Sequence, residues 1–138
     1  MLVIRKKDLD LMMCHALDGY PLEVCGLLIG IPDDPAVATR VTSVEPAENV
    51  AASSRIYEIA PKVLLEVERR AEATGTQIVG VYHSHTHTDA KPSPTDIAQA
   101  PDPTWHYVLV SLRDEHPCVR SWNIDSGNIE EEEVVVKW

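Results

Sequence analysis

The sequence lacks a long apolar run, a cluster of basic residues and a cysteine framework. A membrane-spanning helix needs about 20 apolar residues, so we expect no membrane partner. The formal net charge is −10 with no Lys/Arg cluster to offset it, which argues against a nucleic acid partner. The widely spaced Cys14, Cys25 and Cys118 form no Cys-x-x-Cys motif, and we expect them to be small buried apolar residues.

The composition is that of an ordinary globular protein, with 44% hydrophobic and 25% charged residues. We expect one domain over residues 1–138. Residues 1–7 lack the apolar core of a secretory signal, which indicates a cytoplasmic location. The acidic run at residues 130–133 is typical of a solvated strand edge.

The order of apolar patterns predicts an α/β (α+β-like) fold, a mixed β-sheet flanked by helices. Strands are expected at residues 2–4, 24–31, 36–44, 78–82, 107–112, 119–124 and 129–136, with a turn at 32–35 and brief extended structure at 56–59. One helix is expected from a cap at Asp8 to Tyr20 with a single apolar stripe. Others are expected from Pro61 to a C-cap at Gly75 and from Pro94 to about Ala100.

Two histidines and a carboxylate follow the predicted strand at residues 78–82. His83 and His85 alternate, so both imidazoles can point to one face. Ser93 and Pro94 predict the start of a helix with Asp96 in its first turn. Two histidines and one carboxylate leave the fourth zinc position open for water, which is typical of catalytic rather than structural zinc.

This pattern, His-x-His followed by seven residues and Ser-x-x-Asp, resembles the JAMM (MPN-plus) metalloprotease signature. The family's upstream glutamate is matched by Glu23, just before Gly26-Leu27-Leu28-Ile29-Gly30. The resemblance implies the MPN/JAMM (cytidine-deaminase-like) architecture and one Zn²⁺ per chain, bound by His83, His85 and Asp96. It also implies that Glu23 moves the proton of the attacking water and that Ser93 hydrogen-bonds the developing oxyanion.

The short chain is most similar to the compact prokaryotic Mec-type branch of this family, over most of its length. That similarity implies cleavage after the C-terminal Gly-Gly of a ubiquitin-like sulfur-carrier protein, with release of cysteine. An isopeptidase that removes ubiquitin-like modifiers from lysine, a protease that trims carrier precursors, and a non-catalytic MPN scaffold are the alternatives. The oligomeric state stays open.

The loops at residues 48–57 and 86–92 are expected to flank the site, with Asn49, Tyr57 and His87 as candidate substrate-binding residues. We interpret His87 as a groove residue rather than a metal ligand. The histidines His15, His106 and His116 have no partner at ligand spacing, which predicts structural or surface roles.

Overall fold

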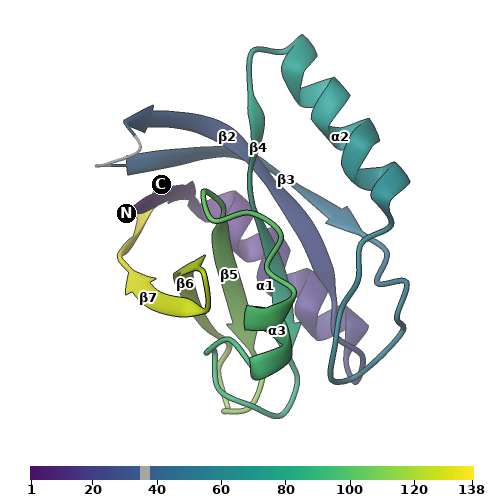
Figure 1. The fold of residues 1–138 in the computed structure, drawn as a ribbon. Helices are drawn as coiled ribbons and strands as arrows, with labels where there is room; N and C mark the ends of the chain where they lie inside the picture. The colour runs from purple at the N-terminus through teal and green to yellow at the C-terminus, as the bar shows by residue number, and fades with distance from the viewer. Residues whose placement is uncertain (35–37) are drawn as a thin grey trace.

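A computed structural model of the chain describes residues 1–34 and 38–138. The strands are β1 (Leu2–Arg5), β2 (Cys25–Asp34), β3 (Ala38–Ala47), β4 (Gln77–His85), β5 (His106–Ser111), β6 (Cys118–Asp125), β7 (Asn128–Glu132) and β8 (Val134–Lys137). The helices are α1 (Lys6–Gly19), α2 (Pro61–Ala73) and α3 (Pro94–Ala98). The strands form a mixed sheet in the order β7-β6-β5-β4-β2-β3-β1-β8, which confirms the predicted fold class (Figure 1).

β4 lies near the middle of the sheet, antiparallel to β2 and parallel to β5. Apart from its first residue, β4 is buried along its whole length. Gly80 permits close approach to β5, since a Cβ at this position would lie 2.1 Å from the carbonyl oxygen of His106. The strand that ends in His85 is therefore held from both sides.

The helices cover opposite faces of the sheet. On one face, Met12 and Ala16 of α1 pack in the core cluster that contains Leu28 and Tyr82. On the other face, α2 packs over β2 and β4, and α3 packs over β4, β5 and β6. Val81, His83 and His85 alternate along the end of β4, so the two histidines emerge on the face covered by α2 and α3.

The helix predictions hold for α2 and in part for α1 and α3. α2 begins at Pro61, and Gly75 follows it with φ +74°, as expected for a glycine that ends a helix. α1 begins at Lys6, so the predicted cap at Asp8 is wrong; Asp8 lies in the first turn and pairs with Arg5 at 2.7 Å. α3 ends at Ala98, two residues before the predicted end.

Not every residue of the apolar stripe predicted for α1 is buried. Leu17 on α1 and Tyr20, the residue after its last turn, are 56% and 51% exposed, so the core covers only part of the predicted stripe. None of the helices in the described residues is long and apolar enough to span a lipid bilayer.

Four predictions about strands and turns need correction. Residues 32–34 continue β2, where a turn over 32–35 was expected, and no strand forms at 56–59. β3 runs three residues beyond the predicted end at Val44; residue 35 of the turn and residues 36–37 of the predicted strand lie outside the described residues. The strand predicted at 129–136 is two strands, β7 and β8, because the chain crosses at Glu133 from one edge of the sheet to the other.

Two predictions about side-chain exposure also fail in part. Cys25 is buried and Cys118 half-buried, but Cys14 is exposed on α1. The acidic run at 130–133 is solvated at three positions, whereas the Glu132 side chain is only 6% exposed.

Glu132 belongs to a buried polar network that joins distant strands. Its Oε2 lies 2.5 Å from His106 Nδ1 and accepts a hydrogen bond from Ser121 Oγ at 2.8 Å. His106 Nε2 lies 2.8 Å from Thr39 Oγ1, so the network links β7, β6 and β5 to β3. Burial opposes ionisation of Glu132, but the hydrogen bonds from His106 and Ser121 outweigh it and lower the pKa of the carboxyl group.

We predict that Glu132→Gln lowers the free energy of unfolding by about 1–3 kcal/mol at pH 7, because a buried charged partner of His106 is lost. The pKa of Glu132 is lower in the folded protein than its ordinary value of 4.5. Its carboxylate therefore stabilises the fold above pH 4.5, and this contribution is lost as the pH falls. The difference in free energy of unfolding between the unchanged protein and Glu132→Gln should therefore be smaller at pH 4 than at pH 7. Urea unfolding at both pH values measures it, and an equal difference at both would contradict the role of the carboxylate.

Candidate metal centre

His83 and His85 bring their imidazoles together at the end of β4. Their Nε2 atoms lie 3.3 Å apart, and both side chains are buried. Ser84, between them, faces the other side of the sheet, where its Oγ accepts a hydrogen bond from the Val24 N–H at 2.9 Å. The alternation read from the sequence thus places both ring nitrogens at one point.

Asp96 reaches the same point from α3. Ser93 is the N-cap of this helix and Pro94 its first residue, as the sequence predicted. A capping box fixes the geometry: Asp96 N–H donates to Ser93 Oγ at 3.1 Å, and Ser93 N–H donates to Asp96 Oδ2 at 2.9 Å. Asp96 Oδ2 then lies 3.2 Å from His83 Nε2 and 3.0 Å from His85 Nε2.

The surroundings of the two rings orient them. His85 Nδ1 lies 2.7 Å from the carbonyl oxygen of Asp89, so Nδ1 carries a proton, and His85 would offer a metal ion its Nε2 once the Nε2 proton that Asp96 accepts is displaced. The His83 ring stacks on Tyr57 with centroids 4.2 Å apart and 24° between the planes. His83 Nδ1 is buried and has no hydrogen-bond partner among the described residues.

The three ligand atoms have the separations of a zinc site. Ligands about 2.0–2.2 Å from a tetrahedral zinc ion lie about 3.3–3.6 Å from one another. Asp96 Oδ2 and the two Nε2 atoms lie 3.0–3.3 Å from one another, which is close to this spacing. A set of two imidazoles and one carboxylate suits zinc and leaves one position open, so this group is a candidate catalytic metal site.

The charges of the group favour a cation. Burial opposes ionisation of Asp96, but hydrogen bonds from both histidines outweigh it, so the pKa of Asp96 lies far below its usual value. Burial lowers the pKa of His83. Burial also opposes the charged form of His85, but hydrogen bonds to Asp96 and to the carbonyl of Asp89 raise its pKa. A carboxylate shared by two imidazoles is thus kept anionic near neutral pH.

Glu23 supplies a second carboxyl group beside this centre. It lies just before β2, is 4% exposed, and its Oε1 has no hydrogen-bond partner among the described residues. Its backbone is anchored by the Ser53 carbonyl at 2.8 Å and by Asn49 Nδ2 at 3.0 Å. Burial raises the pKa of Glu23 to about 7; the charge of His85 opposes this shift and that of Asp96 adds to it.

The three candidate substrate-binding residues lie around the centre in different ways. Asn49 uses its amide to hold its own loop, bonding the carbonyls of Glu23 and Ile56 and the backbone N–H of Ala51 and Glu58. Tyr57 lies against His83. His87 is exposed, with Nε2 3.4 Å from the Tyr20 hydroxyl, and is not part of the metal-binding group. Contact of these residues with substrate stays a prediction.

The sequence did not predict the contacts that hold the loop at residues 86–92, which lies between β4 and α3. Trp122 Nε1 donates to the Ala90 carbonyl at 2.9 Å, and Ser111 Oγ donates to the Thr88 carbonyl at 2.5 Å. Together with the Asp89 carbonyl that holds His85, these contacts fix the loop on β5 and β6. Their acceptors are backbone carbonyls, which every residue carries, so no sequence pattern marks them.

Comparison with known proteins gives consistent results. Residues 5–125 match the family of prokaryotic homologs of the JAB domain. The chain is 40% identical over 136 residues to the CysO-cysteine peptidase of Mycobacterium tuberculosis, covering 98% of this chain and 90% of the relative. It is 38% identical over 107 residues to the desampylase of Haloferax volcanii, covering 74% of each chain.

A solved structure agrees with the fold. The solution structure of a protein from Desulfitobacterium hafniense is 32% identical, superimposes with a TM-score of 0.89, and covers 99% of this chain and 93% of its own. The family match and the two relatives named for hydrolytic activities agree with the JAMM signature. This chain therefore belongs to the prokaryotic JAB-domain (JAMM/MPN-plus) family and is a hydrolytic enzyme.

Proposed function

We propose that this enzyme is a zinc-dependent hydrolase that cleaves the amide bond after the C-terminal Gly-Gly of a ubiquitin-like sulfur-carrier protein and releases cysteine. The observation that carries the proposal is the convergence of His83, His85 and Asp96 within 3.0–3.3 Å beside the buried carboxyl group of Glu23. The cytoplasmic location expected from the sequence is part of the same proposal.

In this reaction His83, His85 and Asp96 hold one zinc ion per chain. When bound, zinc supplies Lewis-acid chemistry, which makes water a stronger acid near neutral pH and polarises a carbonyl group. The chain contributes the orientation of the ligands: the Asp89 carbonyl fixes the His85 tautomer, and the capping box fixes Asp96 Oδ2.

Glu23 acts as general base and then general acid. Its carboxylate accepts the proton of the attacking water and delivers it to the leaving nitrogen, and burial, which raises the pKa of Glu23, favours its uptake of a proton. Ser93 Oγ already accepts the N–H of Asp96, which leaves its own hydrogen free to donate to the oxyanion that forms at the carbonyl.

The choice of substrate rests on the relatives. The similarity to the CysO-cysteine peptidase spans nearly the whole chain, whereas the similarity to the desampylase covers 74% of it. Release of cysteine from a sulfur carrier is therefore the first candidate, and isopeptide cleavage at lysine is the second. A non-catalytic scaffold would not account for a complete ligand set beside the buried Glu23, whose Oε1 has no hydrogen-bond partner among the described residues.

The role of Glu23 is tested by Glu23→Gln, which removes the proton acceptor and keeps the size of the side chain. We expect cleavage to fall by about 10²–10⁴-fold while zinc content stays near one per chain. The matched control is Glu66→Gln, a change of an exposed acid on α2 outside the loops that flank the site, which should cleave at the normal rate. Retained activity in Glu23→Gln would remove Glu23 from the mechanism.

The metal is tested by elemental analysis of protein purified without chelators. We expect about one zinc per chain, loss of cleavage on chelation, and recovery when zinc is restored, since three protein ligands alone define the site. Asp96→Asn should lower the zinc content well below one per chain because the anionic ligand is lost. Metal-independent cleavage would contradict the proposed mechanism.

The substrate is tested by comparing two probes of equal tail sequence. One is a ubiquitin-like carrier with cysteine after its Gly-Gly, and the other joins the same Gly-Gly to a lysine side chain. We expect kcat/KM for the cysteine-bearing carrier to exceed that for the isopeptide by tenfold or more. The reverse order would make the enzyme an isopeptidase.

A further inference from the structure

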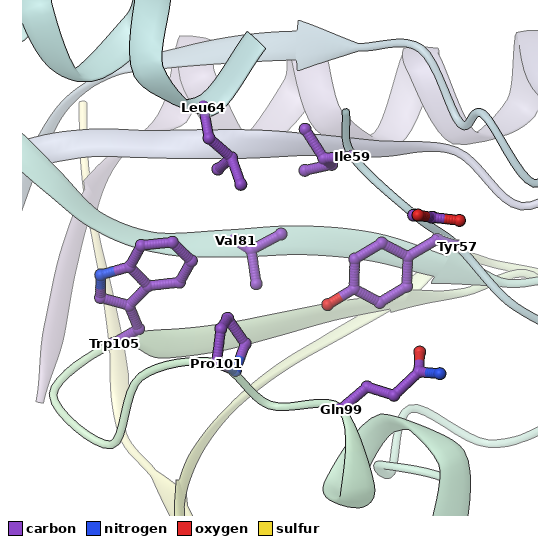
Figure 2. Close-up of a pocket in the computed structure, with 8 residues that line it drawn as sticks. Tyr57, Ile59, Leu64, Val81, Gln99, Pro101 and Trp105 are labelled. Atoms are coloured by element: carbon purple, nitrogen blue, oxygen red, sulfur yellow. The ribbon is translucent and has the colours of Figure 1, made fainter. Parts of the chain in front are cut away.

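The two imidazoles of the metal centre are held in different ways. The His83 ring stacks on Tyr57, with the centroids 4.2 Å apart. Figure 2 shows the Tyr57 ring beside Val81, the residue of β4 that lies two before His83. His85, the last residue of β4, has its Nδ1 2.7 Å from the carbonyl oxygen of Asp89. The orientation of the His85 ring therefore depends on the loop that carries Asp89.

The sheet fixes the backbone of His85 mainly through β5. The pairing of β4 with β2 ends at His83, opposite Cys25. The pairing with β5 continues to His85, opposite Ser111, and the Leu112 N–H donates to the His85 carbonyl at 2.9 Å. A fixed backbone still leaves several rotamers open to a side chain. The ring of His85 thus needs a partner of its own to point at the metal centre.

The loop after β4 has three successive carbonyls engaged, those of residues 88–90. Ser111 Oγ donates to the first at 2.5 Å, and Trp122 Nε1 donates to the third at 2.9 Å. The middle carbonyl, that of Asp89, is the partner of His85 Nδ1. Since β5 and β6 hold the carbonyls on both sides of it, the planar peptide group of Asp89 has little freedom to turn away from His85.

The side chain of Asp89 is held from β6 as well. Its Oδ1 accepts the Ala90 N–H at 2.8 Å, and its Oδ2 lies 3.6 Å from Arg120 Nη1. The Arg120 guanidinium lies over the Trp122 ring, 4.8 Å from its centroid, and donates to Glu131 at 2.7 and 2.8 Å. Arg120 and Trp122 alternate on β6, so they approach the loop from the same face of the strand.

The contact made by Trp122 carries more weight than the ion pair beside it. The side chains of Asp89 and Arg120 are 47% and 30% exposed, so water screens their attraction. Trp122 and Ala90 are buried. A buried carbonyl that loses its donor stays unpaired or must turn to find another, and a turn at Ala90 would move the neighbouring carbonyl away from His85.

We propose that Trp122 and Ser111 are positioning residues for His85: they hold the Asp89 carbonyl against its imidazole and so set the affinity of the centre for zinc. The assignment rests on the proposed function, since that function assigns zinc to this centre. A hydrogen bond to the outer nitrogen of a metal-binding imidazole fixes the ring and makes it a better ligand. Trp122 lies on β6, which carries none of the three proposed ligands, so the zinc affinity depends on a strand outside the ligand set.

The test measures zinc affinity in two variants. Trp122→Phe removes the indole N–H and keeps an aromatic ring in the core, and Ser111→Ala removes only a hydroxyl group. Each zinc-free protein is titrated with zinc against a chromophoric chelator of known affinity. We expect the Kd for zinc to rise about tenfold or more in Trp122→Phe and to rise in Ser111→Ala as well. Saturating zinc should restore most of kcat/KM in both variants.

The matched control is Tyr107→Phe on the neighbouring strand. Tyr107 lies in the same core cluster as Trp122, and its hydroxyl donates to the Asp102 carbonyl at 2.6 Å, outside the loop at residues 86–92. This variant also loses a hydrogen bond from an aromatic side chain to a loop carbonyl. We expect its thermal unfolding temperature to fall while its Kd for zinc stays that of the unchanged enzyme. Thermal unfolding of the zinc-free proteins verifies that all variants are folded.

The zinc titration separates this assignment from the proposed function. If the unchanged enzyme binds zinc and a folded Trp122→Phe or Ser111→Ala binds it equally well, the role of the replaced residue is overturned and the proposed function stands. A rise in Kd for Tyr107→Phe as large as that for Trp122→Phe would also overturn the assignment, since the effect would then follow from a general loss of stability. An unchanged enzyme that binds no zinc would overturn the proposed function and the assignment with it.

Discussion

The candidate site depends on one carboxylate oxygen. Asp96 Oδ2 lies 3.2 and 3.0 Å from the two imidazole nitrogens and accepts the Ser93 N–H at 2.9 Å. The first two contacts come from the end of a strand and the third from the start of a helix. Every feature that places α3 against the end of β4 therefore acts on the metal centre.

The sheet supplies the rigid half of this arrangement. β4 is paired on both sides, and the close approach at Gly80 leaves no room for a side chain between it and β5. The loop after β4 supplies the other half, since its carbonyls are held by Trp122 and Ser111. The imidazoles thus have little freedom, which lowers the reorganisation needed to accept a metal ion.

The sequence predicted the convergence of the site because the signals for it are local. Two histidines at a period of two, and a Ser-Pro pair before an acidic residue, specify direction within one strand and one helix turn. The burial of Glu132 could not be predicted in this way, since its partner His106 lies 26 residues away in the sequence. The exposure of Leu17 and Tyr20 depends on how much of the apolar stripe the core covers, which the helical period of the sequence does not encode.

The two kinds of element that carry the ligands differ in how easily they open. Residues on a central strand are released only when much of the sheet separates, whereas a five-residue helix has almost no stability of its own and depends on its cap. Partial unfolding would therefore remove Asp96 while His83 and His85 stay in place. The three proposed ligands would therefore separate in a fixed order, and the first to leave is Asp96, the one acidic residue among them.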